Sequence, residues 1–217
     1  MIEERMQKLK EKIIDFSLLA EEMVRKSMQG LIERKKEYLS EVIDTLENKA
    51  NMAEVEIDGF CVETIARFQP VAKDLRTIVM ILKMNNDLER VGDTAVNISE
   101  SALFLIERPF VKKLIDLPKM SEIVSNMLKE SVLSFINGDT KLAREICKRD
   151  DIVDALNEQI IRELLTYMLQ DSSTIERSIH LIRISRSLER IADMSTNFCE
   201  DVIFIEEGKI IKHHFEE

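Results

Sequence analysis

The chain has 217 residues, 33% of them charged, and carries a formal net charge of −10 at pH 7. A negative charge with both signs interspersed disfavours binding to nucleic acid or to anionic lipid through bulk electrostatics. A cation or a basic protein patch is the more suitable partner.

The longest uncharged runs are far shorter than the roughly 18 apolar residues that a membrane-spanning helix requires. The first residues, Met1-Ile-Glu-Glu-Arg, lack the basic end and apolar stretch of a secretory signal. Three separated cysteines without a CxxC pair argue against a disulfide framework and predict buried free thiols. We therefore expect a soluble, cytoplasmic protein that reaches the inner face of a membrane only through protein partners.

Apolar residues recur at helical spacing along almost the whole chain, and only five glycines and three prolines interrupt it. We predict six long helices, at residues 3–33, 37–68, 70–107, 119–137, 140–170 and 173–207. Short connections between long amphipathic helices favour antiparallel neighbours. The predicted fold is therefore all-α, with two tandem, pseudo-repeated three-helix bundles at residues 1–109 and 110–217.

Local signals mark several ends of these helices. Pro70 suits the first turn of the third helix, and Pro109 and Pro118 frame the linker between the halves. Ser173-Thr-Ile-Glu176 has the pattern of a capping box that opens the sixth helix. Gly208 suits the end of that helix.

The third and sixth predicted helices carry the same polar motif one hundred residues apart. Asp87-Leu-Glu-Arg-Val-Gly-Asp93-Thr-Ala-Val-Asn97-Ile-Ser-Glu100 recurs as Ser187-Leu-Glu-Arg-Ile-Ala-Asp193-Met-Ser-Thr-Asn197-Phe-Cys-Glu200. A repeat kept only for packing would preserve apolar positions and let charged ones drift. We infer that the repeated polar side chains carry the function.

These polar side chains share one side of each helix. At about 100° per residue, the carboxylates and the asparagine of the motif fall within a stripe of roughly 80°. The opposite side is apolar and predicts these core residues: Val91, Ala95, Ile98, Ile191, Phe198 and Val202. A solvated face is the alternative interpretation of either stripe taken alone.

The preceding helices supply a second row of ligands to each stripe. Folding the chain back around Gln69-Pro70 places Asn51 opposite Glu89 and Glu47 opposite Asp93. The same construction around Asp171-Ser172 places Asp154 opposite Glu189 and Asp150 opposite Asp193. The predicted ligands are therefore Glu47, Asn51, Glu89 and Asp93 in the first half, and Asp150, Asp154, Glu189 and Asp193 in the second.

Converging carboxylates need protons, basic neighbours or a metal to coexist. Arg90 and Arg190 could neutralise part of each cluster, and bound cations could neutralise the rest. Hard oxygen ligands suit Mg²⁺, Ca²⁺, Mn²⁺ or iron, and bridging carboxylates could hold more than one ion. We predict two surface metal sites, with Asn97 and Asn197 as further candidate ligands and weaker binding where Asn51 is neutral.

No motif in the chain points to catalysis. No histidine lies three residues after a glutamate, which removes the ligands expected of ferritin-like di-iron bundles. His180 lies among apolar residues and is expected in the core, whereas His213 and His214 lie in a polar tail. A nucleophile elbow, a P-loop, a dinucleotide fingerprint and an HExxH motif are all absent from the sequence.

The motifs closely resemble those of the PhoU family of phosphate-signalling regulators. Gln69-Pro-Val-Ala-Lys-Asp-Leu-Arg76 is similar to that family's Q-P-x-A-x-D-L-R element. Leu88-Glu-Arg-Val-Gly-Asp93 and Leu188-Glu-Arg-Ile-Ala-Asp193 are similar to its paired L-E-R-I-G-D signatures, with Ala192 in place of the second glycine. The likeness spans nearly the whole chain and occurs twice in the expected order.

The resemblance implies metal ions on the surface of two repeated bundles, sometimes as multinuclear clusters. Iron is the leading candidate, and Zn, Mn, Mg and Ca are the alternatives. The resemblance also implies a non-enzymatic adaptor that joins a phosphate ABC transporter to a sensor histidine kinase and represses the phosphate-starvation response when phosphate is plentiful. Members of the family commonly form homodimers.

Two other functions stay open on the sequence. Clustered carboxylates around redox iron could support a carboxylate-bridged metalloenzyme, although the lack of histidine ligands weighs against it. A purely structural helical scaffold is the second alternative, and failure of the purified protein to retain metal would favour it.

Overall fold

The computed structural model describes residues 2–208, and every regular element in this range is a helix. The first half comprises α1 (Ile2–Glu33), α2 (Lys36–Glu41), the π-helical turn η1 (Val42–Leu46), α3 (Glu47–Phe68) and α4 (Ala72–Ile106). The second half comprises α5 (Asp116–Asn137), α6 (Thr140–Cys147), α7 (Asp150–Gln170), the 3-10 turn η2 (Ser172–Thr174) and α8 (Ile175–Glu207). The predicted all-α fold is confirmed, and His213 and His214 lie outside the described residues.

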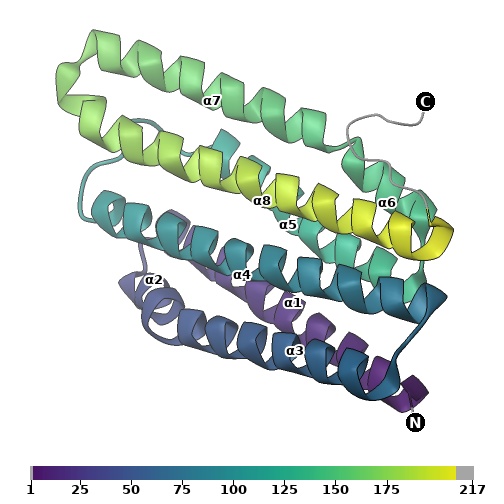
Figure 1. Cartoon of the computed structure of the whole chain (residues 1–217). Coiled ribbons are helices and arrows are strands. Elements are labelled where there is room, and N and C mark those ends of the chain that lie inside the picture. The colour runs from purple at the N-terminus through teal and green to yellow at the C-terminus, as the bar shows by residue number, and fades with distance from the viewer. Residues whose placement is uncertain (1, 209–217) are drawn as a thin grey trace.

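The helices form two layers (Figure 1). One layer holds α3, α4, α8 and α7 side by side in that order, and α1 and α5 lie behind it. α4 and α8 run antiparallel at the centre, so the two bundles meet along the helices that carry the repeated motif. The tandem bundles are therefore confirmed, while the domain limits at residues 109 and 110 stay a prediction. Within residues 2–208, no helix is both long and apolar enough to cross a membrane.

A single apolar core runs through both bundles. All six residues predicted from the helix phase are buried. Phe198 packs edge to face against Phe135 of α5, with ring centroids 6.0 Å apart. Because the apolar sides of α4 and α8 face inwards, their polar stripes are left at the surface of the layer.

The buried thiols and the central histidine follow the sequence prediction in part. Cys61 and Cys199 are buried, whereas Cys147 is half-buried, and all three are free thiols. His180 is half-buried rather than fully in the core, because it stacks on Phe104 across the α4–α8 contact with ring centroids 4.1 Å apart. This contact ties the start of α8 to the end of α4.

Two of the predicted helices are interrupted. The segment 37–68 contains the π-helical turn η1 directly before Glu47, and the segment 140–170 breaks at Lys148 and Arg149, directly before Asp150. A π-helical turn adds one residue to the local turn and often lies at a functional site. In both halves the interruption therefore falls immediately before the first predicted metal ligand of that helix.

Two predicted helix starts also differ. α4 begins at Ala72, two residues after Pro70, because Gln69 adopts a left-handed conformation (φ 48°) that ends α3. α5 begins at Asp116, so Pro118 lies within its first turn instead of ahead of it. Proline is tolerated in a first turn because the backbone N–H that it lacks has no partner there.

The capping box predicted for the sixth helix is wrong. The Asp171 carboxylate accepts bonds from the backbone N–H and the hydroxyl of Ser173, each at 2.9 Å, and η2 forms there before α8 starts. Asp171 is a strong capping residue and lies two residues earlier than the serine of the predicted box. The predicted end is confirmed, since Gly208 terminates α8 with φ 71°.

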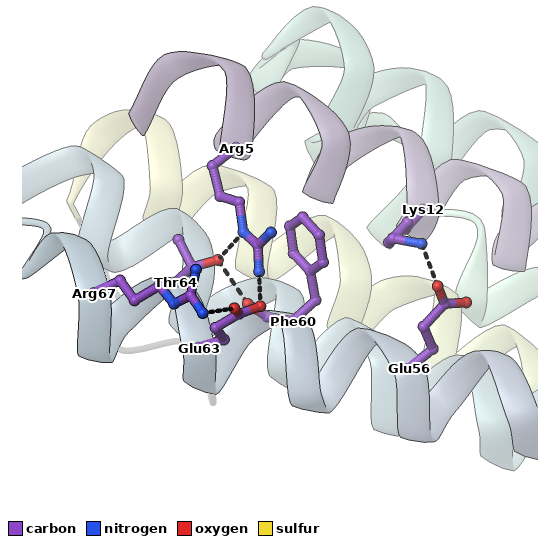
Figure 2. A network of polar contacts seen from close by, with 7 residues as sticks. All are labelled: Arg5, Lys12, Glu56, Phe60, Glu63, Thr64 and Arg67. Atoms are coloured by element: carbon purple, nitrogen blue, oxygen red, sulfur yellow. Dashed lines mark hydrogen bonds and ion pairs between the residues drawn. The ribbon is translucent and has the colours of Figure 1, made fainter. Parts of the chain in front are cut away.

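Polar contacts hold α3 against α1 (Figure 2). Arg5 pairs with Glu63, and its guanidinium lies 3.4 Å from the ring centroid of Phe60. Further along the same contact, Lys12 pairs with Glu56 at 2.6 Å. This seam fixes the rotation of α3 and so decides which of its residues can face α4.

Candidate metal centre

Four carboxylates converge on the α7–α8 pair. The beginning of α7 supplies Asp150 and Asp154, one turn apart, and α8 supplies Glu189 and Asp193 with the same spacing. Asp154, Glu189 and Asp193 all raise the pKa of Asp150, and Asp154 also raises the pKa values of Glu189 and Asp193. The structure therefore brings together the four residues that the antiparallel pairing predicted.

Burial and mutual repulsion disfavour the charged form of this cluster. The pKa of Asp150 rises to about 6, first because of burial and then because Asp193 and Asp154 repel its charge. Burial and the charge of Asp154 also raise the pKa values of Glu189 and Asp193. The cluster thus carries more negative charge than the surrounding side chains compensate.

Asp150 has a carboxylate oxygen that lacks a partner. Its Oδ1 is buried and forms no hydrogen bond with any described residue. A buried acceptor without a donor or a cation is energetically costly. The residues present at this site therefore fit a hard cation, for which carboxylate oxygens are the usual ligands.

Asn157 orients one of the candidate ligands. Its Nδ2 donates to Glu189 Oε2 at 2.6 Å, and its Oδ1 accepts a hydrogen bond from Ser185 Oγ at 2.7 Å. This chain of bonds fixes the side-chain position of Glu189, as residues behind a metal ligand commonly do. The sequence prediction missed Asn157, although it lies two helical turns after Asp150 and hence on the same side of α7.

The first half assembles a related but different cluster on the α3–α4 pair. Burial first, and then the charges of Asp93 and Glu54, raise the pKa of Glu89. Glu47 and Asn51 are not among the groups that act on Glu89, and Asn51 is exposed beside a surface hollow along α3. Glu54 was missed by the sequence prediction, although it lies two turns after Glu47 as Asn157 does after Asp150.

Neither cluster is a closed ligand cage. Within residues 2–208, no group of three or more histidine, cysteine, aspartate or glutamate side chains lies close enough together to enclose a cation. Carboxylates that repel one another in the absence of a cation would need to move closer to bind it. The eight-residue ligand set therefore stays a prediction.

The further candidates and the neutralising arginines are arranged differently from the prediction. Asn197 lines a groove of about 510 Å³ between α4 and α8, together with Asp87 and Arg90. Arg90 pairs with Asp87 at 3.3 Å while also lowering the pKa of Glu89. In the second half, Arg186 rather than Arg190 lowers the pKa of Glu189. The central groove is thus distinct from the two acidic clusters.

The chain matches a known protein family over most of its length. The PhoU domain matches twice, at residues 13–102 and 117–202. The chain is 41% identical to the phosphate-specific transport system accessory protein PhoU homolog of Aquifex aeolicus over 96% of this chain and 94% of that protein. It is 36% identical to the corresponding homolog of Deinococcus radiodurans, over 84% and 85% of the two chains. The crystal structure of PhoU from Pseudomonas aeruginosa superposes with a TM-score of 0.93 at 31% identity, over 96% of this chain and 100% of that one.

Proposed function

The chain belongs to the PhoU domain family, and from this premise we propose that it is an accessory regulator of a phosphate-specific transport system. Relatives aligned over 96% and 84% of the chain are named phosphate-specific transport system accessory proteins. In the proposed role, the protein is a cytoplasmic, non-enzymatic adaptor between a phosphate ABC transporter and a sensor histidine kinase. It would repress the phosphate-starvation response when phosphate is plentiful.

Metal binding at the acidic clusters is the second part of the proposal. Asp150, Asp154, Glu189 and Asp193 would hold cations in the second half, and Glu47, Asn51, Glu89 and Asp93 in the first. The observation that carries this part is the buried, unpaired Oδ1 of Asp150, whose pKa is raised by burial and by four neighbouring carboxylates. A bound cation would supply positive charge that neutralises them.

The position of the clusters supports a link between metal and docking. The α3–α4 and α7–α8 pairs lie on either side of the central α4–α8 contact in one layer (Figure 1). Occupied sites would make this layer less negative, and electrostatic complementarity governs which surfaces dock. We therefore propose that metal occupancy sets the affinity of this layer for a protein partner, which could include a second copy of the chain.

A double variant tests both parts of the proposal. Glu189→Ala with Asp193→Ala should fold normally, retain less metal by elemental analysis, and repress a phosphate-starvation reporter poorly in cells that lack their own regulator. The matched control, Glu145→Ala with Glu158→Ala, removes two exposed carboxylates from the same half outside the cluster. This control should retain both metal and repression.

The outcomes separate the two parts. If the parent chain changed neither phosphate uptake nor the reporter, the regulatory role would be wrong. If the folded, metal-depleted double variant still repressed normally, the regulator would stand and the role of metal in signalling would be wrong. Protein purified without chelator that retained no metal would leave the adaptor or a structural scaffold as its function.

A further inference from the structure

α4 and α8 form an antiparallel pair in constant register. Lys83 of α4 meets Asp201 of α8 at 3.8 Å, and further along α4 Phe104 stacks on His180. The same number of residues separates the two contacts on each helix (83 to 104, and 180 to 201). Positions along the contact can therefore be matched across the pair by counting.

The end of this contact near Lys83 has balanced charges. The groove there is lined by Lys83, Asn86, Asp87 and Arg90 of α4 and by Asn197 and Asp201 of α8. Lys83 pairs with Asp201, and Arg90 pairs with Asp87. Two cationic side chains and two carboxylates thus neutralise one another.

The repeat puts a different set of residues at the other end. One hundred residues away, the positions that match the six polar groove residues are occupied by Arg183, Arg186, Ser187 and Arg190 on α8 and by Asn97 and Ser101 on α4. Both carboxylates are replaced by serines, and an arginine replaces Asn86. The antiparallel register places Ser101 opposite Arg183, and Asn97 opposite Ser187. We call these six residues the arginine end of the α4–α8 contact.

The three arginines at this end are not neutralised by a paired carboxylate. They are spaced three and four residues apart, so they lie on one side of α8, and all three are exposed. Among residues 2–208, none of them forms an ion pair or a side-chain hydrogen bond, whereas Lys83 and Arg90 both do. Arg186 lowers the pKa of Glu189 without pairing with it, and the Glu189 carboxylate already accepts a hydrogen bond from Asn157.

We propose that the arginine end of the α4–α8 contact binds a phosphate-type oxyanion. Its guanidinium, hydroxyl and amide groups can all donate hydrogen bonds, and it holds no carboxylate to compete for them. A phosphate group offers only acceptors, and guanidinium binds it with two parallel bonds. In a chain with a net charge of −10, such a cationic strip concentrates attraction for anions at one place.

This inference deepens the proposed function, because it would give the regulator direct contact with the solute whose uptake it regulates. The anion could be free orthophosphate or a phosphate within a condensed chain, since the donors recognise the same oxygens in both. The inference depends on the proposed function only for its physiological meaning. Binding in solution and repression in cells can therefore fail independently.

Calorimetric titration of the full chain, freed of metal by chelation and dialysis, tests the proposal with orthophosphate and tripolyphosphate as separate probes. We expect binding of at least one probe that weakens as salt is added. Arg183→Gln with Arg190→Gln should weaken it at least tenfold, about 1.4 kcal/mol. The matched control, Lys83→Gln with Arg90→Gln, removes the same number of charges from the equivalent positions and should leave the affinity nearly unchanged.

A second variant keeps every arginine. Ser187→Asp recreates at Arg190 the pair that Asp87 forms with Arg90, so it should weaken binding while circular dichroism reports an unchanged fold. Binding of orthophosphate identifies the free ion as the ligand, and binding of tripolyphosphate alone identifies the condensed chain. Four results would overturn the proposal: no binding of either probe, equal loss in the two double variants, binding only when metal is present, or tighter binding of a hexaglutamate peptide.

Discussion

At the scale of single residues, Asp150 combines burial, an unpaired oxygen and repulsion from neighbouring acids, and its pKa rises to about 6. An aspartate in an unfolded chain titrates near about 3.9, so the folded state binds this proton more tightly. The stability that the proton supplies is complete below about pH 4 and is lost as the pH rises through about 6. The metal-free protein should therefore be less stable at pH 7 than at pH 5 by the contribution of this group.

Asp150→Asn should remove this dependence. We expect the metal-free variant to be more stable than the parent at pH 7 and to change less between pH 4 and pH 7, as measured by urea unfolding. Glu145→Gln, an exposed change outside the cluster, serves as the control and should follow the parent curve. An Asn variant less stable than the parent at pH 7 would show that the charge of Asp150 is not a source of strain.

Asn157 should matter for metal affinity more than for the fold. Asn157→Ala removes the hydrogen bond that positions Glu189 and the amide oxygen that accepts from Ser185 Oγ, which keeps its contact with Met120 Sδ. Loss of a residue that orients a ligand typically lowers metal affinity about 10- to 100-fold. Competition with a chelator of known affinity measures the change, and an affinity equal to that of the parent would mean that Glu189 is not a ligand.

The residues that the sequence predicted and those it missed differ for a geometric reason. The sequence predicted the second-half ligands because two rules fix their positions along the helix axes: spacing by one helical turn and antiparallel folding. These ligands are Asp150, Asp154, Glu189 and Asp193. Glu54 and Asn157 lie one turn further along α3 and α7, beyond the pair spacing used for the prediction. Their roles depend on side-chain direction and burial, which a helical pattern alone does not determine.

At the scale of elements, the sequence predicts the helices better than their interruptions. Residues on both sides of η1 still face the core, as the buried Leu39 and Ala50 show, so the apolar pattern continues across the turn. The break before Asp150 is hidden in the same way between Ile146 and Val153, both of which are buried. These interruptions become visible only in the backbone, yet they set the rotation of the first ligand on each helix.

Replacing two helical glycines, Gly30 and Gly59, by alanine tests how closely α1 packs against α2. A Cβ at Gly30 of α1 would lie 2.5 Å from Leu39 Cδ2 and 2.7 Å from Leu39 Cγ of α2, whereas a Cβ at Gly59 of α3 would meet nothing within 4 Å. We expect Gly30→Ala to cost about 1–3 kcal/mol of unfolding free energy through overpacking. Gly59→Ala should add about 0.5–1 kcal/mol through helix propensity.

Chemical denaturation of the two glycine variants gives this comparison directly, since both make the same covalent change within a helix. A Gly30→Ala variant as stable as Gly59→Ala would mean that α2 can shift away from α1 at little cost. The observed contact predicts instead that α2 is held firmly, which also fixes the start of η1 and the approach to Glu47.

At the scale of the whole molecule, the two halves share a core and a layer but differ in the charges they present. Of the four predicted ligands in each half, three are carboxylates in the first half and all four are carboxylates in the second, because the neutral Asn51 stands where the second half has Asp154. Affinity of hard cations rises with the number of charged ligands. The predicted second-half site should therefore bind metal more tightly than the first.

Metal should stabilise the whole chain, because binding relieves carboxylate repulsion that exists only in the folded state. At a metal concentration about 100 times the dissociation constant, one site contributes about 2.7 kcal/mol. For a chain of this size that corresponds to a rise in melting temperature of about 5–10 °C. Scanning calorimetry of chelator-treated protein with Mn²⁺, Mg²⁺, Zn²⁺ or iron measures the shift.

Variants at the two sites should reduce this metal-induced rise in melting temperature by different amounts. Glu189→Ala with Asp193→Ala should remove most of it, whereas Glu89→Ala with Asp93→Ala, the same changes one hundred residues earlier, should remove less. Each variant removes repelling charge from its cluster, which favours the metal-free fold, but the change at Glu189 also leaves the buried Asn157 Nδ2 without its acceptor. An equal loss in the two variants would refute the difference between the halves, and an undiminished shift in both would place the metal outside the α3–α4 and α7–α8 clusters.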